Sequence, residues 1–315
     1  MVKKIAFLFP GQGSQIVGMG KDIYDIYEIS KEVYDTADKT LGKRITNICF
    51  EGPDEDLKQT INTQPAIVAT SIALMEALRS ELNIVPEYTA GHSLGEYCAM
   101  FTAGVMSLET TLKLIQKRAE LMDKTTGGCM AAILNASDDV LKAGLAEGSK
   151  IGYVDVANYN SPAQVVITGD EKAVKAAGDY LLANGARRVV PLAVSGAFHS
   201  KFMQEAGAIF AEFIEDADLN DSSISVITNV DAQPTTTAED FRAKMPKQIY
   251  SSVHWTQTIQ KMVEEGVDTF IEIGPGKVLA GLNKKIAPEA KVYNVFDKAS
   301  LDATVAELKE QMAGV

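Results

Sequence analysis

The segment TAGHSLGEYCAM, residues 89–100, holds one serine in the pattern G-x-S-x-G. Between a strand and a helix, this pattern forms a nucleophile elbow, a tight turn that exposes the serine hydroxyl beside the helix N-terminus. A serine in this place can also simply cap the helix that follows. The strand-turn-helix context favours Ser93 as a nucleophile. The chemistry would then be acyl transfer or hydrolysis through an acyl-serine.

A serine hydroxyl needs a base to take its proton, and the chain has three histidines. His92 adjoins Ser93, and neighbouring side chains on an elbow point apart, so packing is its expected role. His254 opens a helical pattern and suits a surface or capping position. His199, in SGAFHSKFM, follows a glycine-containing loop and precedes a helix, which would bring it back to Ser93. A purely structural histidine remains the alternative at this position.

The third member of a catalytic triad is missing from the pattern. No Asp or Glu stands out between Ser93 and His199 in a loop that would present it. A backbone carbonyl can accept the imidazole N–H equally well and select its tautomer. A serine–histidine dyad is therefore chemically sufficient.

Composition limits the remaining possibilities. The 315 residues are 46% hydrophobic and 23% charged, as expected for a globular protein with a sizeable core. A net charge of −12 disfavours nucleic acid and anionic membranes as partners. The three cysteines share no metal-ligand spacing, so we expect no metal and free thiols in a reducing compartment. No stretch reaches the roughly 20 apolar residues of a membrane helix, and the run at 5–9 is too short for a signal peptide. We therefore expect a cytoplasmic protein.

Strand and helix patterns alternate along the chain and predict an α/β fold with a parallel sheet covered on both faces. Strands are expected near 3–10, 87–91, 225–230 and 268–275. Helices are expected near 16–40, 64–82, 95–104, 107–123, 200–217, 238–250, 255–266 and 299–313.

The pattern changes at Gly127-Gly128. From there to about residue 196 the order reads strand, helix, strand, strand, helix, strand, which is the βαββαβ unit of ferredoxin-like domains. We therefore predict an inserted subdomain over 127–196 and a catalytic core formed by 1–126 and 197–315.

Six motifs in one order identify a family resemblance. They are FPGQGSQ (9–15), GHSLGE (91–96), QKRAELM (116–122), ANYNSPAQVVITG (157–169), GAFHS (196–200) and EIGPG (272–276). Over about residues 4–296 the chain resembles the malonyl-CoA:acyl carrier protein transacylases and the acyltransferase domains of fatty-acid and polyketide synthases. The resemblance implies an α/β-hydrolase-like core with a ferredoxin-like insertion, in agreement with the element order.

The resemblance also implies a role for each matching residue of the catalytic centre. Ser93 would become malonylated, and His199 would act as base and then as acid. Backbone N–H groups of Gln12 and Leu94 would form the oxyanion hole. The backbone carbonyl of Gln248, in KQIYSSVHW, would orient the histidine and take the place of the missing acid.

Three further matches concern the substrate. Arg118 would hold the free carboxylate of a malonyl group through two parallel hydrogen bonds, although an arginine in KR on a helix is more often solvated. Phe198 would leave little room for a methyl branch, and Asn158 lies in a loop that the family places near the site. His254 occupies a position where an uncharged polar residue is expected.

The implied reaction is a ping-pong transfer of malonyl from malonyl-CoA to the phosphopantetheine thiol of acyl carrier protein for fatty-acid chain extension. It needs no cofactor, and we expect a monomer. Two alternatives stay open, a serine thioesterase and a non-catalytic module that binds the carrier. Because the carrier is acidic, docking would use local positive charge, and the candidates are Arg187, Arg188, Lys201, Lys244, Lys247 and Lys277.

Overall fold

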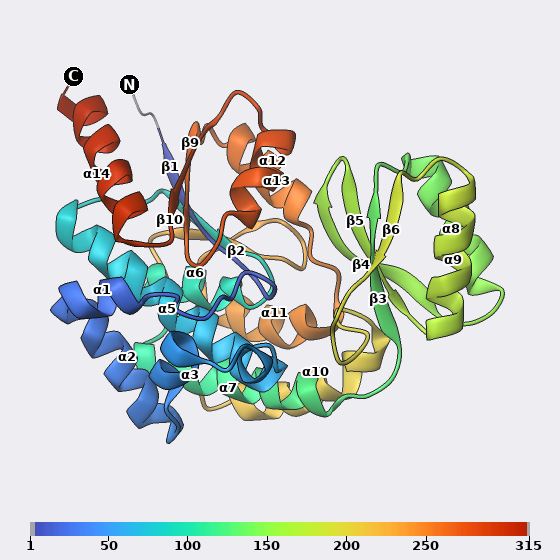
Figure 1. Ribbon diagram of the computed structural model, residues 1–315, viewed down its shortest axis with the longest axis horizontal. Coiled ribbons are helices and arrows are strands. Elements are labelled where there is room, and N and C mark those ends of the chain that lie inside the picture. The colour runs from blue at the N-terminus through green and yellow to red at the C-terminus, as the bar shows by residue number, and fades with distance from the viewer. Residues whose placement is uncertain (1–3, 314–315) are drawn as a thin grey trace.

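The computed structural model describes residues 4–313 and shows two α/β units, each built on its own sheet (Figure 1). The larger sheet has the strand order β10-β9-β1-β2-β7-β8. Its first five strands are parallel, and β8 pairs antiparallel with β7. The strands are β1 (Ile5–Phe9), β2 (Tyr88–Gly91), β7 (Ser225–Ile227), β8 (Pro234–Thr235), β9 (Thr269–Ile273) and β10 (Lys291–Val295). The predicted parallel sheet is confirmed.

Strand β1 shows why this sheet is covered on both faces. Phe7 and Phe9 contribute to one hydrophobic cluster, whereas Ala6 and Leu8 contribute to a second cluster on the opposite face. Side chains alternate along a strand, so an unbroken apolar run must bury both faces. The predicted central strand is therefore buried as expected.

Helices of the larger unit divide between these two faces. Most of these helices contribute residues to the first cluster. They are α1 (Lys21–Ile26), α2 (Glu28–Leu41), α3 (Ile45–Glu51), α4 (Asp54–Leu57), α5 (Thr60–Glu81), α6 (Gly95–Thr102), α7 (Leu108–Lys124), α10 (Gln204–Ile214), α11 (Ala238–Tyr250) and α14 (Lys298–Ala313). Helices α12 (Trp255–Glu264) and α13 (Val278–Ile286) contribute to the second. A short 3-10 helix spans Lys201–Met203.

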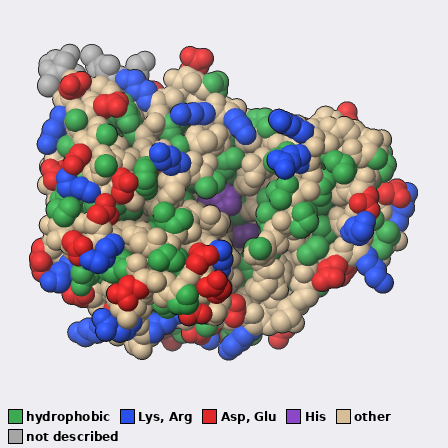
Figure 2. Space-filling model, in the orientation of Figure 1, with side chains coloured by type: hydrophobic (Ala, Val, Ile, Leu, Met, Phe, Trp, Pro, Cys, Tyr) green, Lys and Arg blue, Asp and Glu red, His purple; other side chains and the backbone are tan. Residues whose placement is uncertain are grey.

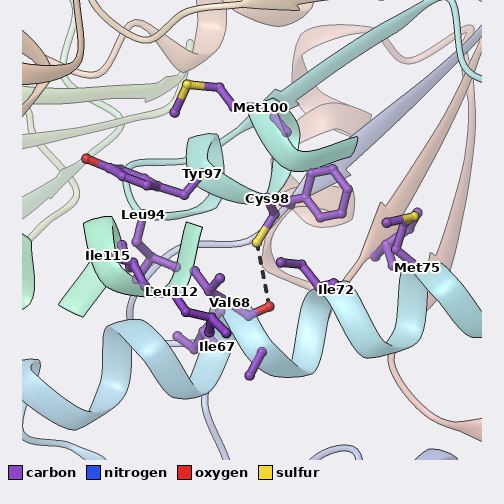
Figure 3. Packing of buried hydrophobic residues seen from close by; sticks show 14 of the residues in the cluster. Ile67, Val68, Ile72, Met75, Leu94, Tyr97, Cys98, Met100, Leu112 and Ile115 are labelled. Carbon is purple, nitrogen blue, oxygen red and sulfur yellow. Dashed lines mark hydrogen bonds between the residues drawn. The ribbon is translucent and has the colours of Figure 1, made fainter. Parts of the chain in front are cut away.

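Helix α6 lies in the first cluster and packs on α5 and α7 (Figure 3). Its Cys98 thiol donates to the Val68 carbonyl of α5 at 3.8 Å. The N-terminal end of α7 is capped by Ser107, whose hydroxyl accepts from the Thr110 N–H. The short helix that carries the elbow is thus held by two longer neighbours.

The smaller unit matches the predicted βαββαβ order. Its elements are β3 (Cys129–Leu134), α8 (Asp138–Ser149), β4 (Val154–Ser161), β5 (Gln164–Gly169), α9 (Glu171–Ala183) and β6 (Arg188–Pro191). The antiparallel sheet has the order β4-β5-β3-β6. Gly127 and Gly196 pair with each other, so the chain enters and leaves this unit at one place. The outer limits of the predicted core, residues 1 and 315, lie outside the described residues.

Several boundaries differ from the sequence-based expectation. The helix predicted from residue 16 begins at Lys21, because Gly18 and Gly20 adopt φ of 96° and 75° in a turn. The short elements α3, α4, β8, α13 and β10 were not predicted. Among the described residues, no helix combines the length and apolar character needed to cross a bilayer.

Candidate active site

Ser93 lies in the turn between β2 and α6, as the elbow pattern predicts. Its φ is 51°, in the left-handed region that non-glycine residues seldom adopt. The flanking glycines allow this turn to pack closely. A Cβ on Gly91 would overlap the backbone of Gly95, and a Cβ on Gly95 would overlap the carbonyl of Phe9 in β1.

This close approach gives a prediction about stability. Gly95→Ala places a methyl group against backbone atoms that cannot move aside, so we expect a loss of about 3 kcal/mol or more in the free energy of unfolding. Gly281→Ala in α13 is the matched control, because its Cβ meets nothing within 4 Å. The control should be neutral or slightly stabilising. Urea unfolding of both variants measures the difference, and equal stabilities would show that the elbow has room to spare.

His199 lies beside Ser93, with 2.8 Å between its Nε2 and the serine Oγ. The other ring nitrogen, Nδ1, is 3.0 Å from the Gln248 carbonyl oxygen and 3.1 Å from that of Ser251. Carbonyl oxygens only accept hydrogen bonds, so Nδ1 carries the proton and Nε2 is free to accept the serine proton. The structure thus places Ser93 and His199 in the geometry of a dyad whose imidazole is held by the backbone carbonyls of Gln248 and Ser251.

The electrostatic surroundings keep this imidazole neutral. Burial, together with the nearby charges of Arg118 and His92, lowers the pKa of His199 to about 3, although both carbonyl contacts oppose the shift. A histidine that is neutral at pH 7 can act at once as a general base. The same shift means that the unfolded chain binds more protons as pH falls below 6.5, so acid weakens the fold.

We therefore predict an unusual pH dependence for acylation of Ser93. The rate should show no histidine inflection near pH 6.5 and should persist to about pH 5. Two other buried groups titrate nearby, since burial lowers the pKa of His92 and raises the pKa of Glu96 to about 7. The profile should therefore be recorded for the wild type and for Glu96→Gln. A fall in rate centred on pH 6.5 in both proteins would contradict the neutral, buried histidine.

Arg118 is fully buried, contrary to the usual solvated position of a helix arginine. Its guanidinium donates to Gln64 Oε1 at 2.7 Å, to Gln248 Oε1 at 3.1 and 3.3 Å, and to Ser93 Oγ at 3.0 Å. It also lies over the Tyr97 ring. Within residues 4–313, none of the ion pairs includes this arginine. A buried cation held by neutral groups is poised to receive an anion.

A sequence signal for this burial existed. Leu114, Ile115, Leu121 and Met122 are buried on α7, and they stand three or four residues from Arg118. Residues with that spacing share one helix face, so the arginine belongs to the apolar stripe and not to the solvated face.

A cavity of about 400 Å³ opens over Ser93 and His199 between the two units. Histidine side chains are visible at the base of this hollow in Figure 2. The cavity is lined by Gln12, Gly13, Gln15, Lys58, Gln64, His92, Ser93, Arg118, Met122, Met130, Asn158, Leu192, Ala193, Val194, Phe198 and His199. The structure therefore brings Asn158 and Phe198 to the site, and both are largely buried.

The two residues of the implied oxyanion hole follow neighbouring strands. Gln12 comes after β1, and Leu94 follows Ser93 after β2. Their backbone N–H groups donate to no partner in the described part of the chain. Leu94 is buried, where N–H groups are nearly always paired, and Gln12 is partly buried. Two unpaired N–H groups beside the candidate nucleophile suit a site for a developing oxyanion.

The side chains of the other two histidines make no hydrogen bond to Ser93. His92 Nε2 lies 2.8 Å from Asn160 Oδ1, and its ring lies near Trp255, which agrees with a packing role. His254 stacks on Tyr159 with ring centroids 5.2 Å apart. It occupies the N-cap position of α12, one of its two predicted positions, but its side chain makes no capping hydrogen bond.

Three residues of the site were not predicted from the sequence. Gln64 binds the guanidinium of Arg118. Asn229 Oδ1 accepts from the Ser93 N–H at 2.8 Å, and Glu96 accepts from the Asn229 N–H at 2.6 Å. Asn229 follows β7, the neighbour of β2, and a polar residue at the carboxyl end of such a strand is the signal that could have identified it.

Lys244, one of the candidates for carrier docking, is not available for that role. Its side chain is only 18% exposed and bonds with Asp231 at 2.8 Å and Thr235 at 2.7 Å. Lys201 lies against the Tyr153 ring, and Lys277 lies against the Phe296 ring.

An elbow serine, a carbonyl-held histidine and free N–H groups on a parallel α/β sheet define an enzyme of the serine acyl-transfer class. Comparison with known proteins is more specific. The chain belongs to the acyl transferase domain family, whose model matches residues 6–309.

Individual relatives agree along almost their whole length. The malonyl CoA-acyl carrier protein transacylase of Bacillus subtilis (strain 168) is 43% identical over 98% of this chain and 99% of its own. The crystal structure of an acyl carrier protein S-malonyltransferase from Vibrio cholerae has a TM-score of 0.92 at 38% identity and covers 96% of this chain and 100% of its own. A third match comes from a solved structure of a type II PKS acyl carrier protein in complex with its malonyl-transacylase. The matching chain has a TM-score of 0.94 at 35% identity, and the match covers 97% of this chain and 100% of that chain.

Proposed function

We propose that this protein transfers a malonyl group from malonyl-CoA to the phosphopantetheine thiol of acyl carrier protein and so supplies fatty-acid chain extension. The observation that carries the proposal is the buried guanidinium of Arg118, which has neutral partners and lies 3.0 Å from the Ser93 hydroxyl. An acyl group that ends in a free carboxylate supplies the missing anion at that distance from the nucleophile.

The first half-reaction forms the acyl-enzyme. Ser93 Oγ attacks the thioester carbonyl while His199 Nε2 takes the hydroxyl proton, and the N–H groups of Gln12 and Leu94 stabilise the oxyanion. The tetrahedral intermediate breaks its C–S bond, and CoA leaves with the proton from His199. Arg118 holds the malonyl carboxylate throughout and so fixes the carbonyl over Ser93.

The second half-reaction reverses these steps with another thiol. The carrier's phosphopantetheine thiol gives its proton to His199 and attacks the malonyl ester, and Ser93 Oγ leaves with that proton. Side chains and backbone N–H groups supply nucleophile, base and charge stabilisation, so the reaction as written needs no cofactor or metal. Phe198, largely buried at the cavity, disfavours a methyl-branched acyl group.

Intact-mass spectrometry after mixing with malonyl-CoA, with and without the holo carrier, tests the proposal. We expect an adduct of one malonyl group on the protein, which the carrier then removes while malonyl-carrier accumulates. Free malonate formed as fast as CoA in the presence of carrier would show a thioesterase instead. Carrier binding without any adduct would show a non-catalytic binding module.

We also propose that the enzyme acts as a monomer in the cytoplasm. Ser93, His199 and Arg118 contact one another within a single chain, which supports a reactive centre that needs no residue from a second copy. Light scattering during size-exclusion chromatography tests the oligomeric state, and activity confined to a dimer peak would contradict it.

A further inference from the structure

The backbone conformation of Ser93 requires support from its surroundings. A left-handed φ in a residue with a Cβ is unfavourable and persists only where neighbouring groups enforce it. The glycines of the elbow provide space but no force. Some other contact must hold the turn in place while the hydroxyl reacts.

Two side-chain amides hold the peptide groups on either side of Ser93. Asn229 Oδ1 accepts from the Ser93 N–H at 2.8 Å, and Gln248 Nε2 donates to the Ser93 carbonyl at 2.7 Å. The Gln248 amide also donates to Asn229 Oδ1 at 3.3 Å. The peptide groups before and after Ser93 are thus each hydrogen-bonded to a side-chain amide, and these two amides also contact each other.

Asn229 is itself anchored at two points. Its Nδ2 donates to the Gly91 carbonyl at 2.7 Å, and its backbone N–H donates to Glu96 Oε2 at 2.6 Å. Gly91 ends β2 and Glu96 lies in the first turn of α6, so one loop residue ties together both ends of the elbow. Glu96 is buried and does not line the cavity, which leaves this contact as its evident task.

Gln248 extends the same network to the substrate side. Its Oε1 accepts from Arg118 Nε and Nη2, and its backbone carbonyl accepts from His199 Nδ1. Gln248 therefore contacts the nucleophile, the base and the carboxylate-binding arginine, and so fixes their relative positions. Asn229 in turn accepts a hydrogen bond from the Gln248 side chain.

We infer that Asn229, anchored by Glu96, is a positioning residue that holds Ser93 in its reactive conformation within reach of His199 and Arg118. The inference rests on the proposed function, because it requires Ser93 to be the nucleophile. Without the Asn229 amide, the Ser93 N–H loses its acceptor and the turn relaxes. A displacement of about 1 Å in a reacting atom lowers a rate by about 10²-fold.

The test is the single-turnover rate of malonylation of Asn229→Ala at saturating malonyl-CoA, followed by intact mass. We expect a rate about 10²-fold below that of the wild type, with KM changed by less than about threefold, because only the reacting geometry is lost. Asn283→Ala is the matched control. Asn283 is equally buried, its amide oxygen accepts from the Trp255 indole N–H, and it does not line the cavity. It should lower Tm yet retain the wild-type rate within about threefold.

Two further variants keep the inference testable if Asn229→Ala fails to fold. Glu96→Gln retains an oxygen acceptor for the Asn229 N–H, whereas Glu96→Ala does not. The malonylation rate of Glu96→Gln should therefore be about tenfold higher than that of Glu96→Ala. Gln248→Ala keeps the backbone carbonyl that binds His199 but removes the side-chain amide. The double mutant Gln248→Ala/Asn229→Ala should lose less rate than the product of the two single losses, because the effects of residues in one network are not additive.

Several results would overturn the inference. They are a wild-type rate in Asn229→Ala, equal rate losses in Asn229→Ala and Asn283→Ala at equal Tm, or equal rates in the two Glu96 variants. Failure of the proposed function looks different. A wild-type protein that forms no malonyl adduct contradicts the transferase reaction itself and removes the premise, whereas a normal wild-type adduct with an unaffected Asn229→Ala contradicts the positioning role alone.

Discussion

Ser93→Ala is expected to form no malonyl adduct and to lose transferase activity by about 10⁶-fold, the loss found when the serine of a serine–histidine pair is removed. The hydroxyl that lies 2.8 Å from His199 Nε2 and 3.0 Å from Arg118 Nη2 is the atom that we propose to carry the acyl group. Alanine keeps the backbone contacts of the elbow, so binding of malonyl-CoA should change little. Intact mass after mixing with malonyl-CoA gives the adduct, and the carrier assay gives turnover.

Ser107→Ala provides the control for this prediction. It removes the hydroxyl that caps α7 and should cost about 1 kcal/mol of stability, comparable to a moderate structural change, while the adduct still forms. An adduct that survives in Ser93→Ala would place the nucleophile elsewhere. Loss of the adduct in both variants would mean that a general loss of stability, and not the missing nucleophile, explains the result.

The sequence predicted best those parts of the fold that depend on local pattern. The βαββαβ unit could be predicted because turn residues bound each of its strands and helices. Within each element, the apolar residues recur with the spacing typical of a strand or of a helix. The segment 276–297 was not. Helix α13 has nine residues and contains Gly281, and β10 is an edge strand that is mostly half-buried, so neither carries a strong period.

The candidate site divides in the same way. Ser93 and His199 could be found because G-x-S-x-G is a recognisable turn and histidines are scarce in this chain. Gln64, Glu96 and Asn229 could not, since amides and carboxyls are common and nothing local distinguishes the ones that converge. Glu96 and Asn229 converge only when β2 and β7 pair in the sheet, and Gln64 joins them only when α5 packs beside that edge.

Arg118→Ala should reduce malonyl transfer far more than acetyl transfer, with a change of about 10⁴-fold in the ratio of kcat/KM for the two acyl groups. A polar pocket that binds a carboxylate discriminates strongly, because an acetyl group leaves the guanidinium unpaired. Both rates will fall to some extent, since Arg118 also contacts Ser93 Oγ and Gln248. The ratio is therefore the measurement that isolates recognition of the carboxylate.

The same substitution has an electrostatic consequence that separates the two roles of this arginine. Arg118 is one of the charges that lower the pKa of His199, so its removal should raise that pKa and bring the loss of base activity to a higher pH. Arg79→Ala is the matched control, because Arg79 binds the Thr102 carbonyl at 3.0 Å and lies outside the cavity lining. The control should keep both the acyl ratio and the pH profile. Suppose that Arg118→Ala lowers malonyl and acetyl transfer equally while its pH profile shifts. The guanidinium would then lower the pKa of His199 without binding the malonyl carboxylate. Selectivity for malonyl would have to come from other residues of the cavity.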